Sequence, residues 1–197
     1  MELYLIRHGK TVWNKENRFQ GIRDIDLAPE GINKAQELGK KLEGIQFDKI
    51  FSSPLKRAYQ TAQLATQNRY KIIKDKALTE INFGAMEGQT YEDMEKSTSN
   101  FRYFFTAPEK FQPAEGGESL EHMCQRTKEF IQKKLEPIYK INPQAKIMIV
   151  AHGALNKAIM CYLENHGLKD FWKDGLQENC QATIFEYNGN EWSKIKE

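Results

Sequence analysis

Two histidines occur in the same local context, each at the end of a short apolar run and directly before a glycine. His8 follows the run 3–6, with Arg7 between them, and His152 follows the run 147–151. An imidazole in such a place can act as a nucleophile, as a general base or as a donor to an anion. A single histidine at a strand end is more often a structural hydrogen-bonding residue, so even two of them are only suggestive.

Fixed positive charge accompanies the two histidines. Arg7 directly precedes His8. Arg57 falls in the first turn of a predicted helix that has Ser53 as its N-cap and Pro54 as its first residue. Because the N-terminus of a helix exposes backbone N–H groups, an arginine in its first turn favours an anion. The alternative is an ordinary solvated arginine on a helix surface.

Two further segments supply neutral donors and a candidate acid. Asn14, Gln20 and Gly21 can donate hydrogen bonds to the same anion, or can simply form turns. Glu80 lies among apolar residues that would desolvate a carboxylic acid and favour its protonated form, as a general acid requires. Glu87 is the second candidate, and because most glutamates are exposed surface residues, the pattern alone does not choose between them.

No motif for a metal or a nucleotide accompanies these residues. The chain has no HExxH, no aspartate-rich calcium loop, no His/Cys cluster at zinc spacing and no GxxxxGKS/T motif. We therefore expect chemistry without a metal or other cofactor, carried by two histidines, two arginines and one carboxylic acid.

The elements that must position these residues alternate between strands and helices. Apolar runs predict strands near residues 3–6, 49–52, 70–74 and 147–151, and a closing hairpin from 181–187 and 191–195. Helical periodicity predicts helices from Pro29, from Ser53, from Ser119 to about Tyr139, and from 153 to about 163. This order indicates a three-layer α/β/α sandwich with a mainly parallel central sheet. Ligands bind in such folds beyond the carboxyl ends of the strands, where both histidines are expected.

One segment interrupts this alternation. Residues 78–117 are rich in aromatic residues, glycine and proline, and predict a lid-like insertion over the carboxyl edge of the sheet, within a single domain of residues 1–197. In this segment Phe101, Phe104 and Phe105 share one face at helical spacing. Ordinary packing is the favoured explanation of that face, and an apolar wall for a bulky substrate is the alternative.

Composition excludes several classes of function. With 29 basic and 27 acidic residues the formal net charge is +2, which is too even for a nucleic-acid or membrane-surface footprint. No apolar run reaches the roughly 20 residues of a membrane span, and no signal peptide is recognisable. Cys124, Cys161 and Cys180 form no disulfide framework and no CxxC pair, which favours the cytoplasm. Formation of a homodimer remains an open possibility at this point, because the closing hairpin can offer an edge strand to a partner.

The order and spacing of several sequence blocks resemble the histidine phosphatase superfamily, also called the phosphoglycerate-mutase-like family. The blocks cover nearly the whole chain: Leu5–Gly9 with Thr11 and Asn14, Phe19–Gly21, Ser52–Ala58 with Gln60–Ala62, Glu80 with Phe83–Gly84 and Glu87–Gly88, Gly116–Ser119, and Val150–Gly153. One departure is Lys10, where many relatives carry glutamate; its role stays open.

The resemblance implies a role for each candidate residue. His8 is implied as a neutral nucleophile that becomes phosphorylated on Nε2, and Glu80 as the acid for the leaving group and then the base for water. Arg7, Arg57 and a cationic His152 are implied to bind the phosphoryl oxygens. Asn14 and Gln20 are implied to assist them.

The resemblance favours a metal-independent phosphatase that acts on a small phosphomonoester. The alternative is a bisphosphoglycerate-dependent phosphoglycerate mutase, whose members carry a longer insertion before the second histidine and a longer tail. The block Phe83–Gly88 is more typical of the phosphatase branch, which includes α-ribazole phosphatase and broad-specificity phosphatases. A non-catalytic phosphate-binding scaffold is a third reading, but such relatives usually lack one of the five catalytic residues, and all five are present here.

Overall fold

A six-stranded sheet with the order β3-β2-β4-β1-β5-β6 forms the centre of the computed structural model, which describes residues 1–96 and 100–196. The strands β1 to β4 are parallel, and β5 and β6 add to one edge in antiparallel orientation. The strands are β1 (Glu2–Arg7), β2 (Lys49–Ser52), β3 (Ile72–Lys74), β4 (Lys146–Ala151), β5 (Ala182–Tyr187) and β6 (Trp192–Lys196).

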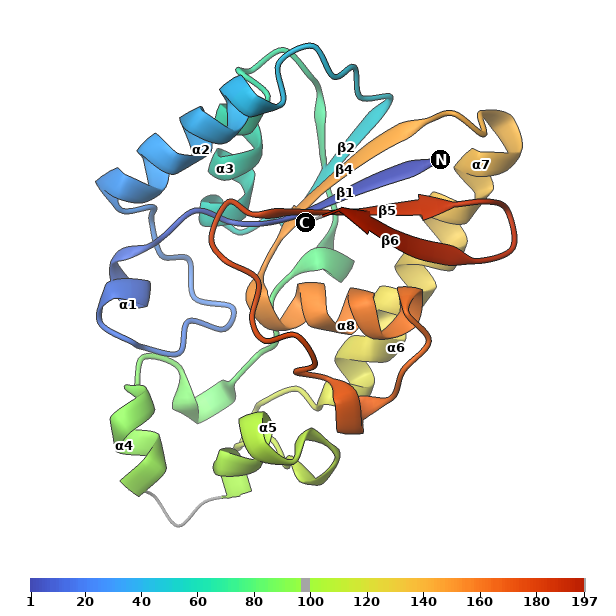
Figure 1. Ribbon diagram of the computed structural model, residues 1–197. Helices are drawn as coiled ribbons and strands as arrows, with labels where there is room; N and C mark the ends of the chain where they lie inside the picture. Colours follow the sequence, from blue (N-terminus) through green and yellow to red (C-terminus); the bar gives the residue numbers. More distant parts are fainter. Residues whose placement is uncertain (97–99, 197) are drawn as a thin grey trace.

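Helices cover both faces of this sheet, as Figure 1 shows. One face carries α2 (Pro29–Lys41) and α3 (Lys56–Ala65), and the other carries α6 (Leu120–Phe130) and α8 (Gly153–Leu163). Successive side chains of β1 point to opposite faces. Leu3 and Leu5 therefore join one hydrophobic core, and Tyr4 and Ile6 join the other. The predicted three-layer α/β/α sandwich is confirmed.

The predicted helix starts have different outcomes. Pro29 is the first residue of α2, and the Ser119 side chain caps α6. The predicted start of α3 at Ser53 and Pro54 is wrong, because α3 begins at Lys56. The backbone N–H of Ser53 instead donates to the carbonyl of Val150 at 3.1 Å, which extends the pairing of β2 with β4 by one residue.

The segment predicted as one long helix from Ser119 to about Tyr139 is helical throughout, but it is not a single α-helix. After α6, a π-helical turn (Ile131–Leu135) leads into α7 (Glu136–Ile141). Pro137 has no N–H to donate within a regular α-helix. The wider π turn directly before it accommodates this missing bond.

The segment 78–117 lies beyond the carboxyl ends of the parallel strands, below the sheet in Figure 1. Phe101 and Phe104 are buried and stack with ring centroids 5.6 Å apart, whereas Phe105 is 45% exposed. Packing therefore explains two of the three phenylalanines. Positions 97–99 of the predicted insertion, and position 197 of the predicted domain, lie outside the described residues. The short elements here are α4 (Tyr91–Lys96), α5 (Tyr103–Thr106) and 3-10 turns at Gly84–Met86, Asn100–Arg102 and Pro108–Lys110.

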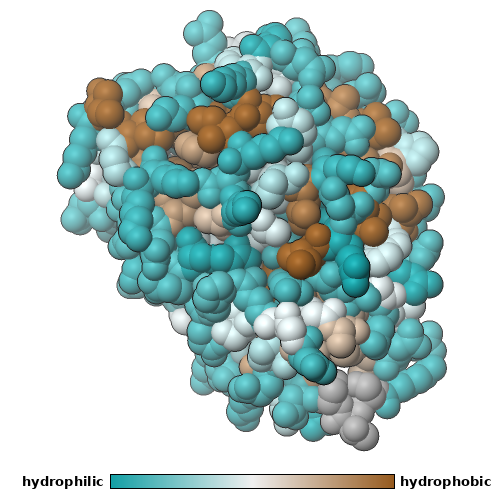
Figure 2. Space-filling model, turned by 180° about the vertical axis from the view of Figure 1, so that it is seen from behind, coloured by the Kyte–Doolittle hydropathy of each residue, from teal (hydrophilic) through white to brown (hydrophobic). Residues whose placement is uncertain are grey.

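The face seen from behind is mostly hydrophilic, with hydrophobic residues in separate patches (Figure 2). Within residues 1–96 and 100–196, no helix is long and apolar enough to cross a membrane. All three cysteines are free thiols. The strand β6 forms one edge of the sheet. A homodimer through this edge and a cytoplasmic location stay predictions.

Candidate active site

The parallel pairing of β1 with β4 brings the two histidines together. Arg7 pairs with Ala151, and the N–H of His8 donates to the carbonyl of Ala151 at 2.9 Å. The rings of His8 and His152 lie with their centroids 5.2 Å apart, and both side chains are buried. The prediction that both imidazoles stand at one carboxyl edge of the sheet is confirmed.

A backbone contact and burial favour the neutral form of the His8 imidazole. Its Nδ1 lies 2.7 Å from the carbonyl oxygen of Gly9. Because a carbonyl oxygen only accepts, Nδ1 carries the hydrogen and Nε2 keeps its lone pair. Burial, together with the charges of Arg57 and Arg7, lowers the pKa of His8 well below its ordinary value of 6.5.

The side chain of His152 lies against the ring of His8. Burial and the charges of Arg57 and His8 lower the pKa of His152 well below 6.5. The neutral imidazole is therefore favoured before an anion binds, and the cationic His152 that the family resemblance implies stays a prediction for the site with a bound phosphoryl group. Neither ring nitrogen has a hydrogen-bond partner in the described part of the chain. A neutral ring still has one N–H that can donate to a phosphoryl oxygen.

Two arginines present guanidinium groups that are held by backbone carbonyls. Arg57 is only 1% exposed and donates to the carbonyls of Arg23 and Gly21 at 2.6 and 2.7 Å. Arg7 donates from Nη1 to the carbonyl of Gln177 at 2.6 Å. The Nε of each is buried and has no partner among the residues described. Since a buried donor without an acceptor is costly, both groups suit an anion that would accept from them.

The N-terminus of α3 is not the anion site that its sequence suggested. The backbone N–H of Lys56, the first residue of the helix, donates to Oδ1 of Asp24 at 2.7 Å. The helix therefore contributes the side chain of Arg57 to the pocket, while an aspartate from a distant loop occupies its terminus. No local pattern around Ser53 reveals that partner.

Asn14 and Gln20 line the same pocket as His8. The backbone N–H of Thr11 donates to Oδ1 of Asn14 at 3.1 Å, and the Thr11 hydroxyl lies 2.9 Å from Oε1 of Gln20. With these oxygens engaged, the amide nitrogens are the groups that can serve an anion. Gly21 also lines this pocket, and its carbonyl accepts from Nη2 of Arg57; its role as a donor to the anion stays a prediction.

The carboxylate of Glu80 lies at the N-terminus of α8 and lines the pocket. It accepts backbone N–H groups from Ala154 at 3.2 Å, Leu155 at 2.9 Å and Ile81 at 3.0 Å. The sequence predicted apolar surroundings for this carboxyl. The structure instead holds it half-buried with three N–H donors, at the positive end of a helix.

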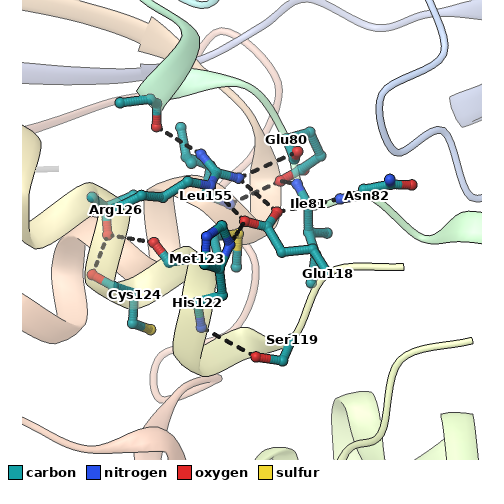
Figure 3. A network of polar contacts seen from close by, with 12 residues as sticks. Glu80, Ile81, Asn82, Glu118, Ser119, His122, Met123, Cys124, Arg126 and Leu155 are labelled. Atoms are coloured by element: carbon teal, nitrogen blue, oxygen red, sulfur yellow. Dashed lines mark hydrogen bonds and ion pairs between the residues drawn. The ribbon is translucent and has the colours of Figure 1, made fainter. Parts of the chain in front are cut away.

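An ion pair fixes the loop that carries Glu80 (Figure 3). Arg126 of α6 donates to both carboxylate oxygens of Glu118, at 2.7 and 2.9 Å. It also donates to the carbonyl of Ala77 at 2.6 Å and, more weakly, to the carbonyl of Glu80 at 3.4 Å. Sequence reasoning missed both partners of this pair. The Gly116–Ser119 block contained Glu118, but nothing local indicated its partner on a later helix.

Glu87, the second candidate acid, has a structural role. Its Oε1 accepts from the N–H groups of Ile22 and Phe83 at 2.8 and 3.3 Å, and its Oε2 lies 3.1 Å from Nε of Arg23. The side chain is only 3% exposed. It does not line the pocket of His8, whereas Glu80 does. Glu80 is therefore the better candidate for the acid.

Aromatic side chains form the outer wall of the pocket. Most come from the segment 78–117, and the Trp172 ring packs against Phe104 and Phe105. Lys10 is exposed and does not line the pocket. No cluster of three or more His, Cys, Asp or Glu side chains occurs in the searched ranges 1–96 and 100–196, and independence from metal stays a prediction. The aromatic lining residues are Phe19, Phe83, Tyr91, Phe104, Phe105 and Trp172.

Comparison with known proteins agrees with this geometry. The model of the histidine phosphatase superfamily (branch 1) matches residues 3–196. The chain belongs to the histidine phosphatase superfamily. The family predicted from the sequence is thereby confirmed, and with it an enzyme of the phosphatase type.

The relatives of this superfamily member include phosphatases and mutases. It is 35% identical over 186 residues to phosphoserine phosphatase 1 of Hydrogenobacter thermophilus, covering 93% of this chain and 86% of that protein. It is 33% identical to the 2,3-bisphosphoglycerate-dependent phosphoglycerate mutase of Cytophaga hutchinsonii, covering 85% and 79%. The structure of Bacillus stearothermophilus YhfR matches with a TM-score of 0.90 at 32% identity, covering 100% of this chain and 96% of that one.

We predict that the two buried histidines make the protein less stable in acid. Their pKa values are lowered in the folded state, so below pH 6.5 the unfolded chain binds more protons than the folded one. The free energy of unfolding should therefore decrease as the pH is lowered below 6.5, by up to about 1.4 kcal/mol per pH unit for each histidine. Thermal unfolding between about pH 7 and pH 5.5 measures this slope.

The variant His8→Gln should show a shallower slope than the wild type. Ile141→Ala is the control, because Ile141 is exposed, carries no titratable group and lies outside the pocket, so its substitution should leave the slope unchanged. Equal slopes for His8→Gln and the wild type would contradict the prediction.

Proposed function

We propose that this protein is a phosphatase that hydrolyses small phosphomonoesters through a phosphohistidine on His8, without a metal. The observation that carries the proposal is the neutral His8, with Nε2 available, in one pocket with the buried Arg57, the half-buried Arg7 and the Glu80 carboxylate. In this proposal a single domain of residues 1–197 carries the site, and the segment 78–117 is its lid-like wall. Phosphoryl binding is assigned to Arg7, Asn14, Gln20, Gly21, Arg57 and His152.

In the first step, Nε2 of His8 attacks phosphorus, so that a P–N bond forms while the bond to the leaving oxygen breaks. Negative charge on the three peripheral oxygens meets Arg7 and Arg57. Both guanidiniums are already held by carbonyls, so little reorganisation is needed as that charge develops. Glu80 gives a proton to the leaving oxygen.

In the second step, Glu80 acts as the base. Water attacks the phosphohistidine, its proton passes to the carboxylate, and the P–N bond breaks. His8 returns to the neutral form and inorganic phosphate leaves. The backbone N–H groups at the start of α8 stabilise the carboxylate in the form that this step requires.

The wall of the pocket supports a phosphomonoester with an apolar or aromatic leaving group. Phe105 and Tyr91 are 45% and 38% exposed, and both line the pocket. Arg18 also lines it, but its Nε and Nη1 donate to Glu16 and to the carbonyl of Gly88. This arrangement suits a carboxylate-bearing substrate less well and favours the phosphatase over the phosphoglycerate mutase. Relatives named for phosphoserine support the coarser conclusion that the substrate is small and phosphorylated.

We predict that His8 is phosphorylated during turnover. Rapid quench with a labelled phosphomonoester in excess EDTA should yield an acid-labile, base-stable adduct on this residue, because no other pocket group can accept the phosphoryl. His8→Ala should lose essentially all turnover while keeping the fold. Substantial phosphatase activity in that variant, or activity that chelator abolishes and magnesium restores, would disprove the mechanism.

We predict that Glu80→Gln affects poor leaving groups most. An alkoxide needs a proton to leave, whereas p-nitrophenolate leaves almost unaided. General-acid catalysis is typically worth 10²–10⁴-fold, so phosphohistidine formation from an alkyl phosphate should fall on the order of tenfold or more beyond that from p-nitrophenyl phosphate. The first step must be measured alone, because loss of the base would slow the second step for both substrates.

The matched control for this experiment is Glu87→Gln. It should reduce stability without separating the two substrates, because Glu87 holds the main chain of Ile22 and Phe83 and does not itself line the pocket. Equal losses for both substrates in Glu80→Gln would show that Glu80 only shapes the site.

We predict that Phe105→Ala selects against bulky substrates. Removing an aromatic ring from the wall should raise KM for 1-naphthyl phosphate by roughly tenfold, since contact with a Phe side chain is worth about 1.5–3 kcal/mol when fully buried. KM for 3-phosphoglycerate should change much less. Ile141→Ala, an exposed apolar position outside the pocket, is the control. Parallel changes for both substrates would contradict an apolar subsite.

A further inference from the structure

The segment of residues 177–181, directly before β5, wraps around the end of β1. The side chain of Asn179 donates to the carbonyl of His8 at 2.8 Å. The carbonyl of Gln177 accepts from Nη1 of Arg7 at 2.6 Å. This segment therefore contacts both the main chain of the proposed nucleophile and the guanidinium beside it.

The side chain of Gln177 anchors this segment in the core. Its Nε2 lies 2.9 Å from the carbonyl of Leu5, 3.1 Å from that of Gln181 and 3.0 Å from Oγ1 of Thr183. Its Oε1 accepts from Nδ2 of Asn156 at 2.7 Å. Gln177 is only 7% exposed. One buried amide thus connects β1, β5 and α8, which makes the main chain at Gln177 a fixed point.

The guanidinium of Arg7 is placed between this fixed point and the start of α8. A Cβ on Gly153 would lie 3.5 Å from Nε of Arg7, an ordinary contact distance, so the guanidinium packs against the main chain at the start of α8. Among the described residues, the hydrogen bond recorded for this guanidinium is the one to the Gln177 carbonyl. Because a guanidinium is planar, the hydrogen bond at Nη1 and the contact with Gly153 together determine where its other N–H groups point.

We propose that Gln177 is a positioning residue of this enzyme: its buried amide fixes the carbonyl that orients Arg7 toward the transferring phosphoryl group. The inference rests on the proposed function, since it assumes that Arg7 binds that group. Misplacing a binding group by about 1 Å can cost on the order of 10²-fold in rate. Loss of the amide should therefore impair catalysis through Arg7 and not only weaken the fold.

A double-mutant cycle separates these two roles. The variants are Gln177→Met, which keeps the length but removes the hydrogen bonds, Arg7→Met, and the pair. The measurements are the dissociation constant of vanadate, kcat and KM for p-nitrophenyl phosphate, and thermal unfolding. Gln177→Met should weaken vanadate binding and lower kcat by on the order of tenfold or more. In the Arg7→Met background the same change should have less than about a twofold further effect.

A control variant measures what the loss of a buried hydrogen bond does elsewhere. Thr66 is 1% exposed, and its hydroxyl donates to the carbonyl of Ala62 at the end of α3, outside the pocket. Thr66→Val should therefore lower the unfolding temperature and leave vanadate affinity and kcat unchanged. If Gln177→Met does not unfold cooperatively, Gln177→Asn replaces it in the cycle, because the shorter amide cannot reach both Leu5 and Asn156.

The outcomes distinguish the inference from the function on which it rests. Suppose that the wild type binds vanadate and forms phosphohistidine. If the Gln177 variant then changes vanadate affinity and kcat equally in the wild-type and the Arg7→Met backgrounds, only the positioning role is overturned. A wild type that neither binds vanadate nor forms phosphohistidine would overturn the proposed function and this inference with it. Strong coupling to Arg7, without coupling for Thr66→Val, is the result expected.

Discussion

The in-register parallel pairing of β1 with β4 is the constraint on which the rest of the structure depends. Both strands are buried on both faces, and their alternating side chains fill the two cores on either side of the sheet. A slip of one residue would exchange those cores, so the hydrophobic pattern strongly specifies the register. The same register places His8 against His152. The apolar residues that fold the sheet therefore also assemble the pocket.

The pocket concentrates positive charge without neutralising it directly. The guanidiniums of Arg57 and Arg7 donate to backbone carbonyls, and within residues 1–96 and 100–196 neither forms a salt bridge with a carboxylate. Burial lowers the pKa of Arg57 to about 10, which still leaves it cationic at neutral pH. A carboxylate in direct contact would compete with an incoming phosphate, whereas a carbonyl orients the cation and leaves its charge available. The same charges disfavour protonation of the histidines.

The sequence predicted what local patterns determine. Repeated strand-His-Gly contexts located both histidines, and Pro29 and Ser119 marked two helix starts because their chemistry suits those positions. The start of α3 was mispredicted because Ser53 pairs with β4 instead of capping a helix. The partners that orient the site, such as Gln177 for Arg7 and Glu118 for Arg126, were missed. They come from segments distant in sequence, and only the fold brings them together.

The segment 78–117 divides into a part fixed to the core and a part that forms the wall. At its start, the Glu80 carboxylate is bound to the N-terminus of α8, and the adjoining main chain is bound to Arg126. Further along the segment, Phe104 and Phe105 pack against each other and against Trp172 through their rings. Hydrogen bonds to the main chain demand a specific geometry, whereas apolar contacts tolerate changes of shape. A sequence can therefore alter the aromatic wall while the Glu80 carboxylate keeps its place at the N-terminus of α8.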